Sequence, residues 1–217
     1  MKFIQAIQPY RFSLHLIFVP LLIIAVEYGG FFILGVPIFG YLLIPLIDFL
    51  LRRYKVNDFA IKDIRENLSL KLIQLWPLIQ LILLGYCVYS VSNNTTMQLA
   101  EFISMAAITG IITGSIGITF AHELMHKKSN KERWLADILM GLVLYGHFRS
   151  EHMLIHHRYV GTPRDAATAK YNENFFKFLL RVIPNCFLSA WNEEKARLDK
   201  KEMRVYSLKN PFWRYFG

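Results

Sequence analysis

Cysteine is scarce throughout this sequence, and charge is scarce in its first half. The 217 residues include two cysteines, Cys87 and Cys186, and neither belongs to a C-x-x-C pair, which excludes a disulfide framework and a thiolate metal site. Before Phe120 the chain has 8 basic and 6 acidic residues, against 17 and 10 from Ala121 onward. Apolar residues make up 54% and aromatic residues 15%, which excludes a disordered chain. The first half therefore predicts a membrane region, and the second a basic region beside it.

The formal net charge is +9. The basic residues follow long apolar segments and form no arginine-rich recognition helix. Anionic lipid headgroups are therefore the expected partner of these charges, and nucleic acid is not expected.

Four apolar runs predict an all-α integral membrane fold with about four transmembrane helices in two hairpins. The third and fourth runs are each long enough to cross roughly 30 Å of hydrocarbon at about 1.5 Å per residue. Glu27 and the Gly29-Gly30 pair separate the first two runs and favour a turn there. The runs cover residues 12–26, 31–51, 68–91 and 99–120. Residues 12–120 thus form a predicted transmembrane region, and residues 121–217 a cytoplasmic histidine-rich region.

Lysine and arginine occur on alternate sides of these runs. They precede the first run, lie between the second and third, and follow the fourth, whereas the other two connections contain none. By the positive-inside rule, the N-terminus, the middle loop and everything after Phe120 are predicted to be cytoplasmic. The residues used are Lys2, Arg11, Arg52, Arg53, Lys55, Lys62, Arg65, Lys71, Lys127, Lys128, Lys131 and Arg133.

Two further apolar segments predict helices that do not span. Residues 134–145 are too few to cross a membrane and include Asp137, so they predict a helix at the cytoplasmic face. From Phe175, apolar residues alternate with Lys177 and Arg181. This pattern fits an amphipathic helix on the membrane face and, equally, a buried packing helix.

Six of the seven histidines fall between positions 122 and 157. His122 and His126 are four residues apart in H-E-L-M-H, a spacing that places both imidazoles on one helical face, where they can share a metal ion. His152 and His156 repeat this spacing, and His157 is about 100° further round an α-helix. The clustering predicts metal binding rather than five structural histidines.

Ligand type and number narrow the choice of metal. Imidazole suits zinc, copper, iron or nickel. Five histidines exceed the needs of one zinc ion and fall short of two octahedral irons, which favours two metals with further ligands from elsewhere. His147 breaks the four-residue spacing and is expected to support the site or to pack. His15, in the first run, is expected near the interface rather than as a ligand.

Three motifs carry a family resemblance. H-E-L-M-H-K from His122, Y-G-H-F-R-S-E-H-M-L-I-H-H-R from Tyr145 and T-P-R-D-A-A-T-A from Thr162 resemble the membrane-bound alkane 1-monooxygenases of the fatty acid desaturase and hydroxylase superfamily. Desaturases typically have H-x-x-H-H in the second motif, and this chain has one more residue there, as alkane and xylene-type hydroxylases do. Ile155 and Ala166 depart from the common glycine and proline of the family.

The resemblance implies terminal hydroxylation of alkanes or related alkyl chains by a non-haem di-iron enzyme of the plasma membrane. Dioxygen is the oxidant, and rubredoxin supplies electrons. By resemblance, the five iron ligands are His122, His126, His152, His156 and His157, and Glu123, Glu151 and Asp165 accept hydrogen bonds that orient imidazoles. Asp48 either supports the metal site or is an interfacial residue beside Arg52 and Arg53.

Two other functions compete with this hypothesis. One is a membrane zinc metalloprotease, in which His122 and His126 bind zinc and Glu123 is the general base. The other is an inactive fragment, because the family has further histidine motifs and helices beyond the region matched here. From the resemblance we expect residues 1–217 to be one truncated desaturase-like domain that cannot hold two irons alone.

Overall fold

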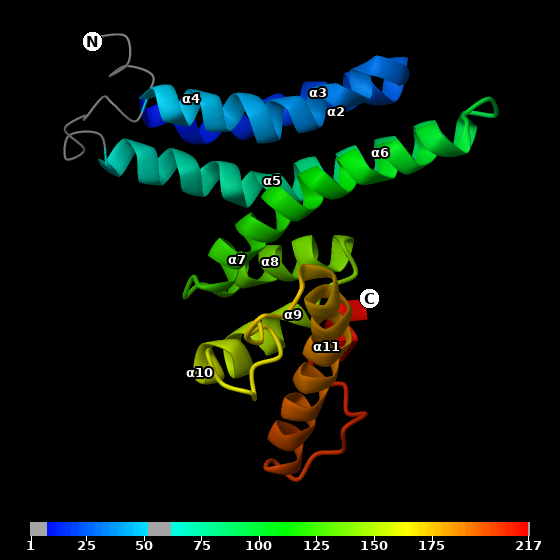
Figure 1. Ribbon diagram of the computed structural model, residues 1–217. Coiled ribbons are helices and arrows are strands. Elements are labelled where there is room, and N and C mark those ends of the chain that lie inside the picture. Colours follow the sequence, from blue (N-terminus) through cyan, green and yellow to red (C-terminus); the bar gives the residue numbers. More distant parts are fainter. Residues whose placement is uncertain (1–7, 52–61, 217) are drawn as a thin grey trace. The chain divides into compact units, whose positions relative to one another are not determined.

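The computed structural model describes residues 8–51 and 62–216, and within these ranges the chain forms helices and no strands. The predicted all-α membrane fold is confirmed. The chain divides into two compact units, Met1–Leu124 and Met125–Gly217. We call these unit 1 and unit 2 and describe each by itself (Figure 1).

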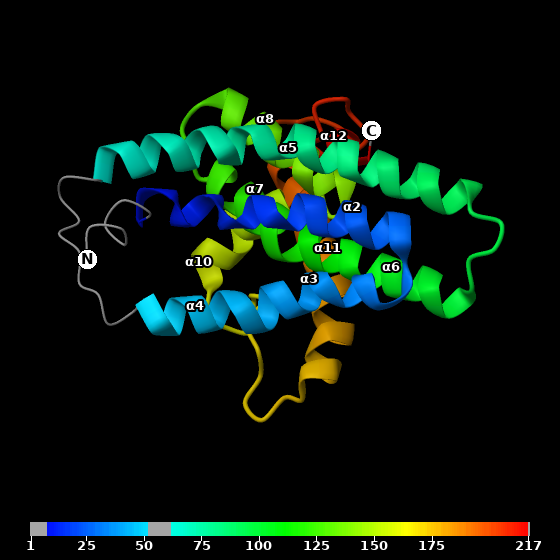
Figure 2. The same ribbon diagram turned by 90° about the horizontal axis from the view of Figure 1, so that it is seen from above.

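Unit 1 begins with a helical hairpin. Its first arm is the 3-10 helix η1 (Gln8–Ile17) followed by α2 (Phe18–Tyr28). Gly29 and Gly30 then turn the chain with φ values of 57° and 51°, in the left-handed region that glycine tolerates best. The second arm runs back alongside α2, as Figures 1 and 2 show. It consists of η2 (Gly30–Leu34), α3 (Gly35–Ile38), the π-helix η3 (Phe39–Leu43) and α4 (Ile44–Leu51).

The second hairpin of unit 1 packs against the first. It comprises α5 (Lys62–Asn93), α6 (Leu99–Ile112), the π-helix η5 (Thr113–Gly117) and α7 (Ile118–Met125), whose last residue belongs to unit 2. Helix α2 contacts both α5 and α6. Trp76 of α5 is fully buried and donates a hydrogen bond from its indole N–H to Oε1 of Gln80 at 3.0 Å.

Within residues 8–51 and 62–216, three helices are long and apolar enough to cross a membrane: Gly30–Leu50, Asn67–Asn93 and Leu99–Met125. The first predicted span differs, because it falls in the shorter apolar helix Ser13–Tyr28. With rises of 1.5 Å for its α part and 2.0 Å for its 3-10 part, that helix measures about 26 Å, somewhat less than the hydrocarbon thickness. Of the charges used for orientation, Lys2, Arg52, Arg53 and Lys55 lie outside the described residues.

Acidic side chains join the two hairpins of unit 1 at the predicted turn. The backbone N–H of Gly30 donates to Oε1 of Glu101 on α6 at 3.3 Å. A Cβ atom at Gly29 would lie 1.9 Å from the same oxygen, so this position has no room for a side chain. The Tyr86 hydroxyl donates to Glu27. The turn residues singled out in the sequence therefore hold the two hairpins together.

Unit 2 consists of short helices and one long one. Helix α8 (Asn130–Leu142), capped by the Ser129 hydroxyl, covers most of the predicted segment 134–145. It is followed by α9 (Phe148–Glu151), the π-helix η6 (His152–His156) and α10 (His157–Tyr159). After a loop come α11 (Phe175–Asp199), capped by the Asn174 side chain, and the short α12 (Phe212–Phe216).

Helix α11 has two faces along its length. Its buried residues recur every four positions at Cys186, Ala190, Glu194 and Leu198. Apolar side chains near its N-terminus are exposed, Leu180 by 77%. The predicted amphipathic helix is therefore present, and its place at a membrane face stays a prediction.

Candidate metal centre and apolar cavity

Helix α7 presents the first histidine pair. Ala121, Leu124 and Met125 are buried, whereas His122 and His126 are exposed. The apolar side of the helix thus fixes its rotation and leaves both imidazoles on the polar side. His126 directly follows the last residue of α7 and lies one turn beyond His122.

The second histidine group is carried by a π-helix. In η6 the hydrogen bonds run from residue i to i+5, so residues five apart come close in space. Nε2 of His157 lies 2.9 Å from Nε2 of His152. The rings of His152 and His156 stack with centroids 5.3 Å apart. The α-helical spacing assumed from the sequence is therefore corrected, because His152 makes its closest approach to His157 and not to His156.

The two groups converge on His152. Its Nε2 lies 3.2 Å from Nε2 of His126, and the rings of His126 and His157 have centroids 4.9 Å apart. Within unit 2, His126, His152 and His157 thus each offer a ring nitrogen at one place. Imidazole nitrogens at such separations can be bridged by a metal ion after small side-chain rotations.

Asp165 holds the remaining histidine of the group. Its Oδ2 lies 2.9 Å from Nδ1 of His156, and Asp165 is 2% exposed. The Thr168 hydroxyl donates to the same oxygen at 2.5 Å, and the Ala167 N–H donates to Oδ1 at 2.9 Å. A buried carboxylate with these partners orients the imidazole and directs Nε2 away from itself.

Arg181 on α11 braces the loop that carries Asp165. Its guanidinium donates to the carbonyls of Ala166 and Thr168 at 2.9 and 3.1 Å, and to both carboxylate oxygens of Glu173 at 2.6 and 2.7 Å. The hydrogen bonds from Arg181 to Glu173, together with one from the backbone N–H of Lys170, lower the pKa of Glu173 to about 2. Arg181, which the sequence suggested only as part of a polar helix face, therefore supports the position of Asp165.

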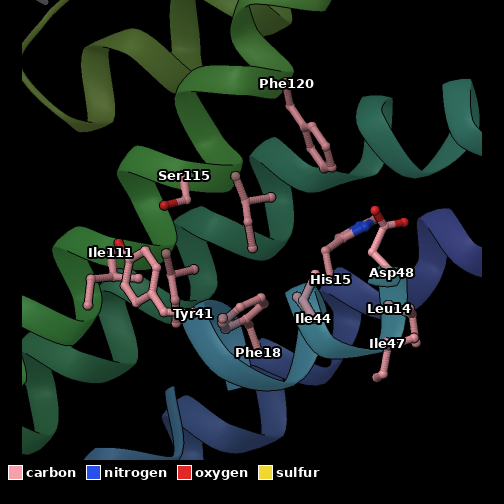
Figure 3. Close-up of a pocket in the computed structure, with 13 residues that line it drawn as sticks. Leu14, His15, Phe18, Tyr41, Ile44, Ile47, Asp48, Ile111, Ser115 and Phe120 are labelled. Carbon is pink, nitrogen blue, oxygen red and sulfur yellow. The ribbon is translucent and has the colours of Figure 1, made fainter. Parts of the chain in front are cut away.

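Unit 1 contains an apolar cavity of about 550 Å³ (Figure 3). Ile112, Ile116 and Phe120, four residues apart along the end of α6, η5 and α7, form one wall. An imidazole and a carboxyl group also line the cavity, from His15 of η1 and Asp48 of α4. Phe120 lies two residues before His122 on α7, so this wall continues along the chain into the first histidine motif.

Comparison with known proteins gives the family. Residues 96–216 match the model of the family described as "Fatty acid desaturase", which is more than half of the chain. The chain belongs to the fatty acid desaturase family. The matched region includes all the histidines and acidic residues of the candidate metal centre.

Several family members are similar to this chain. Alkane 1-monooxygenase of Pseudomonas putida is 42% identical over 118 residues, which are 54% of this chain and 29% of that protein. Alkane 1-monooxygenase 2 of Alcanivorax borkumensis is 30% identical over 183 residues, 82% of this chain and 47% of that protein. XylM, a xylene/toluene monooxygenase hydroxylase component of Pseudomonas putida, is 27% identical over 207 residues, 89% of this chain and 52% of that protein. The chain thus spans about half or less of these relatives, and the resemblance read from the histidine motifs is confirmed.

Three other predicted site residues, Glu123, Glu151 and His147, have surroundings that differ from one another. Glu123 is exposed beside His122. Glu151 is 1% exposed, and the thiol of Cys186 lies close to its carboxyl group. Burial raises the pKa of Glu151 and lowers that of His147, so the neutral form of each is favoured. His147 packs against Tyr145 and Phe187, with centroids 4.5 and 5.1 Å away, which fits the packing role.

A buried polar network in unit 2 was not predicted. The Ser150 hydroxyl donates to Glu194 at 2.6 Å and lies 2.7 Å from the Tyr215 hydroxyl. Arg197 donates to both carboxylate oxygens of Glu194 at 2.9 Å. The network ties α9, which leads into the histidine-bearing η6, to α11 and α12. Glu194 and Tyr215 are 44 and 65 residues from Ser150 in the sequence, so no local sequence pattern could reveal this network.

Proposed function

We propose that this chain acts in a membrane monooxygenase that hydroxylates the terminal carbon of alkanes or related alkyl chains. The observation that carries the proposal is the convergence of His126, His152 and His157, with His156 held by Asp165, in a member of the fatty acid desaturase family. The alkane 1-monooxygenases among its relatives support the substrate class.

The donor set fits two iron ions. His122, His126, His152, His156 and His157 offer imidazole nitrogen, which suits iron and not calcium or magnesium. Five donors do not fill two six-coordinate ions, so we propose that further ligands complete the site. When bound, non-haem iron would activate dioxygen for insertion into an unactivated C–H bond.

The residues of this chain orient the imidazoles and contact the alkyl chain. Asp165 accepts the hydrogen bond from Nδ1 of His156 and so keeps Nε2 available to a metal. The π-helix η6 gives His152 and His157 a common direction. The cavity of unit 1 offers isoleucine and phenylalanine side chains to an alkyl chain.

We further propose that the protein lies in the inner membrane, with its N-terminus and histidines on the cytoplasmic side. The alternation of basic connections supports this orientation. A cytoplasmic site is accessible to rubredoxin, the proposed electron donor. Reporter fusions after residues 94 and 128 test the orientation: the first should be active only outside the cytoplasm, and the second only inside.

The reaction is tested with oxygen-18 gas. Membranes containing the chain, alone and with a co-expressed segment of a matched relative that carries further histidines, are supplied with dodecane, rubredoxin and its reductase. The expected product is dodecanol with the heavy isotope in its hydroxyl, lost in His152→Gln and retained in the α8 control Lys131→Gln. Alcohol oxygen derived from water, or no alcohol from membranes that have bound iron, would contradict the proposal.

The zinc metalloprotease is the less favoured alternative, because it leaves His152, His156 and His157 without a role. It predicts a different result in the same membranes. Peptide hydrolysis that disappears in Glu123→Gln would support it, and the hydroxylase predicts no such activity.

A further inference from the structure

The cavity of unit 1 has a mainly apolar wall, which also includes Tyr41 and Ser115, and one end that carries two ionisable side chains. His15 comes from the first predicted span and Asp48 from the second, and both line the cavity. Figure 3 shows the two side chains pointing toward one another, near Phe120, with Tyr41 and Ile111 away from them. An ionisable pair inside an apolar helical region is costly to maintain and usually has a function.

Aromatic residues enclose His15 on one side. The ring of His15 makes edge contacts with Phe120 and Trp76, with centroids 4.9 and 5.3 Å away, and its Nε2 is buried. Trp76 and Phe120 also contact each other edge to face at 5.7 Å. His15 is thus fixed by rigid neighbours, so that a polar group is presented at a defined place on the cavity wall.

We propose that His15 and Asp48 form a binding site for the hydroxyl end of a neutral long-chain alcohol, whose hydrocarbon chain lies along the isoleucine and phenylalanine wall. An imidazole and a carboxylate together offer a donor and an acceptor, which is what a hydroxyl group needs. A hydrocarbon cannot replace those hydrogen bonds, and a fatty acid would place a second negative charge beside Asp48. The site therefore selects the alcohol over both.

This inference deepens the proposed function, since a primary alcohol is the product of the proposed hydroxylation. Phe120, which contacts His15, is two residues from His122, so the alcohol would be held at the end of the cavity wall that continues into the histidine motif. Binding is measured without turnover, so the result does not depend on whether the chain hydroxylates alkanes.

Trp76 serves as the reporter, because it contacts His15 and Phe120 of the cavity wall. The single-tryptophan variant, with Trp134, Trp191 and Trp213 each changed to Phe, is placed in phosphatidylcholine nanodiscs. Bromine-substituted dodecanol, dodecane and dodecanoate are then titrated in separate experiments. Bromine quenches tryptophan fluorescence on close approach, so quenching reports occupancy beside His15.

We expect half-maximal quenching at an alcohol concentration about tenfold or more below that of the alkane or the fatty acid, the preference given by a hydrogen bond to a charged group. In Asp48→Asn and in His15→Gln the preference should fall to about threefold or less. The control Glu27→Gln, a carboxylate-to-amide change at the turn of the same hairpin, should keep the full preference.

Two results would overturn the proposal. One is equal quenching by brominated dodecanol and dodecane in the protein with His15 and Asp48 intact. The other is an alcohol preference that survives both substitutions, because the hydroxyl would then be bound elsewhere. Circular dichroism at matched helix content separates loss of the site from loss of the fold.

Discussion

Nδ1 of His156 lies 2.9 Å from the buried Oδ2 of Asp165, which comes from the loop that follows the histidine helix. The sequence suggested that Asp165 orients an imidazole, and the structure shows which imidazole it contacts. Arg181 and Thr168 hold the same loop. The geometry of one proposed ligand therefore depends on a carboxylate, a hydroxyl and a guanidinium that bind no metal themselves.

Replacing Asp165 by Asn should weaken metal binding by about tenfold to a hundredfold, because the imidazole of His156 loses its charged acceptor. The measurement is a titration of the purified chain with cobalt(II), followed by its visible absorption. Thr168→Val is the matched control, since it removes a hydroxyl that donates to the same carboxylate oxygen but leaves His156 with its partner. Equal losses in the two variants would show that the loop, and not the acceptor, decides affinity.

The π-helix accounts for the spacing of the second histidine motif. Residues i, i+3 and i+4 share a face in an α-helix, and in a π-helix with i+5 hydrogen bonds the residues i, i+4 and i+5 do so. Histidines 152, 156 and 157 have the second spacing and lie on η6 and its next residue. The extra residue relative to H-x-x-H-H is therefore absorbed by the wider turn.

This relationship predicts that metal affinity tolerates shortening of the motif by one residue but not lengthening by one residue. Deleting the partly exposed Met153 produces the H-x-x-H-H spacing, and an ordinary α-helix should then keep cobalt affinity within about tenfold. Inserting an alanine after Met153 should reduce it by about a hundredfold or more, because no regular helix brings the three imidazoles together. If the deletion is as damaging as the insertion, the π-helix is not what aligns the ligands.

Gly146 is predicted to be essential for the packing of unit 2. A Cβ atom there would lie 2.7 Å from Cβ of Tyr215 and 2.9 Å from its backbone Cα and O atoms. Gly146→Ala should therefore destabilise the chain by about 1–3 kcal/mol through overpacking. Gly141→Ala is the control, since its Cβ meets no atom within 4 Å and alanine favours helix α8. Thermal unfolding in detergent should show a lower midpoint for the first variant and an equal or higher one for the second.

The ion pair of Glu173 and Arg181 predicts a pH dependence of the loop that carries Asp165. The pKa of Glu173 is lowered from 4.5 to about 2, so the folded state favours its ionised form. The stabilisation is therefore complete above pH 4.5 and is lost as the pH falls toward about 2. Limited digestion by pepsin, an acid-active protease, measures the effect.

Near pH 4.5 the loop between Tyr159 and Asn174 should be cleaved more slowly in the unaltered chain than in Glu173→Gln. The difference should shrink as the pH approaches 2, because protonation removes the same charge as the substitution. Glu193→Gln, on the same α11 helix but outside this ion pair, should behave as the unaltered chain does. A protection that does not change with pH would contradict the role of the ion pair.

Local patterns predicted much of the fold. The apolar runs, the Gly29-Gly30 turn and helix α8 are signals contained in a few consecutive residues, and each appears in the structure. The first span was predicted from its apolar composition. Composition does not show that this helix begins as the 3-10 helix η1. The four-residue spacing of the histidines assumed an α-helix, and it failed at η6 because a π-turn depends on packing rather than on helix propensity.

Contacts between distant residues were beyond prediction from one sequence. Ser150, Glu194 and Tyr215 form a buried network, but each is an ordinary polar residue in its own segment. His15 and Asp48 gave separate weak signals as ionisable residues in apolar runs. Their shared cavity depends on how two helices pack, which sequence spacing does not show.

Metal content tests whether the histidines of this chain build a di-iron site. The chain is purified with the co-expressed histidine-bearing segment, and iron and zinc are measured by plasma mass spectrometry. We expect about two irons per chain, lost in His152→Gln and retained in Lys131→Gln. About one tightly held zinc per chain, with or without the added segment, would contradict it and favour the protease.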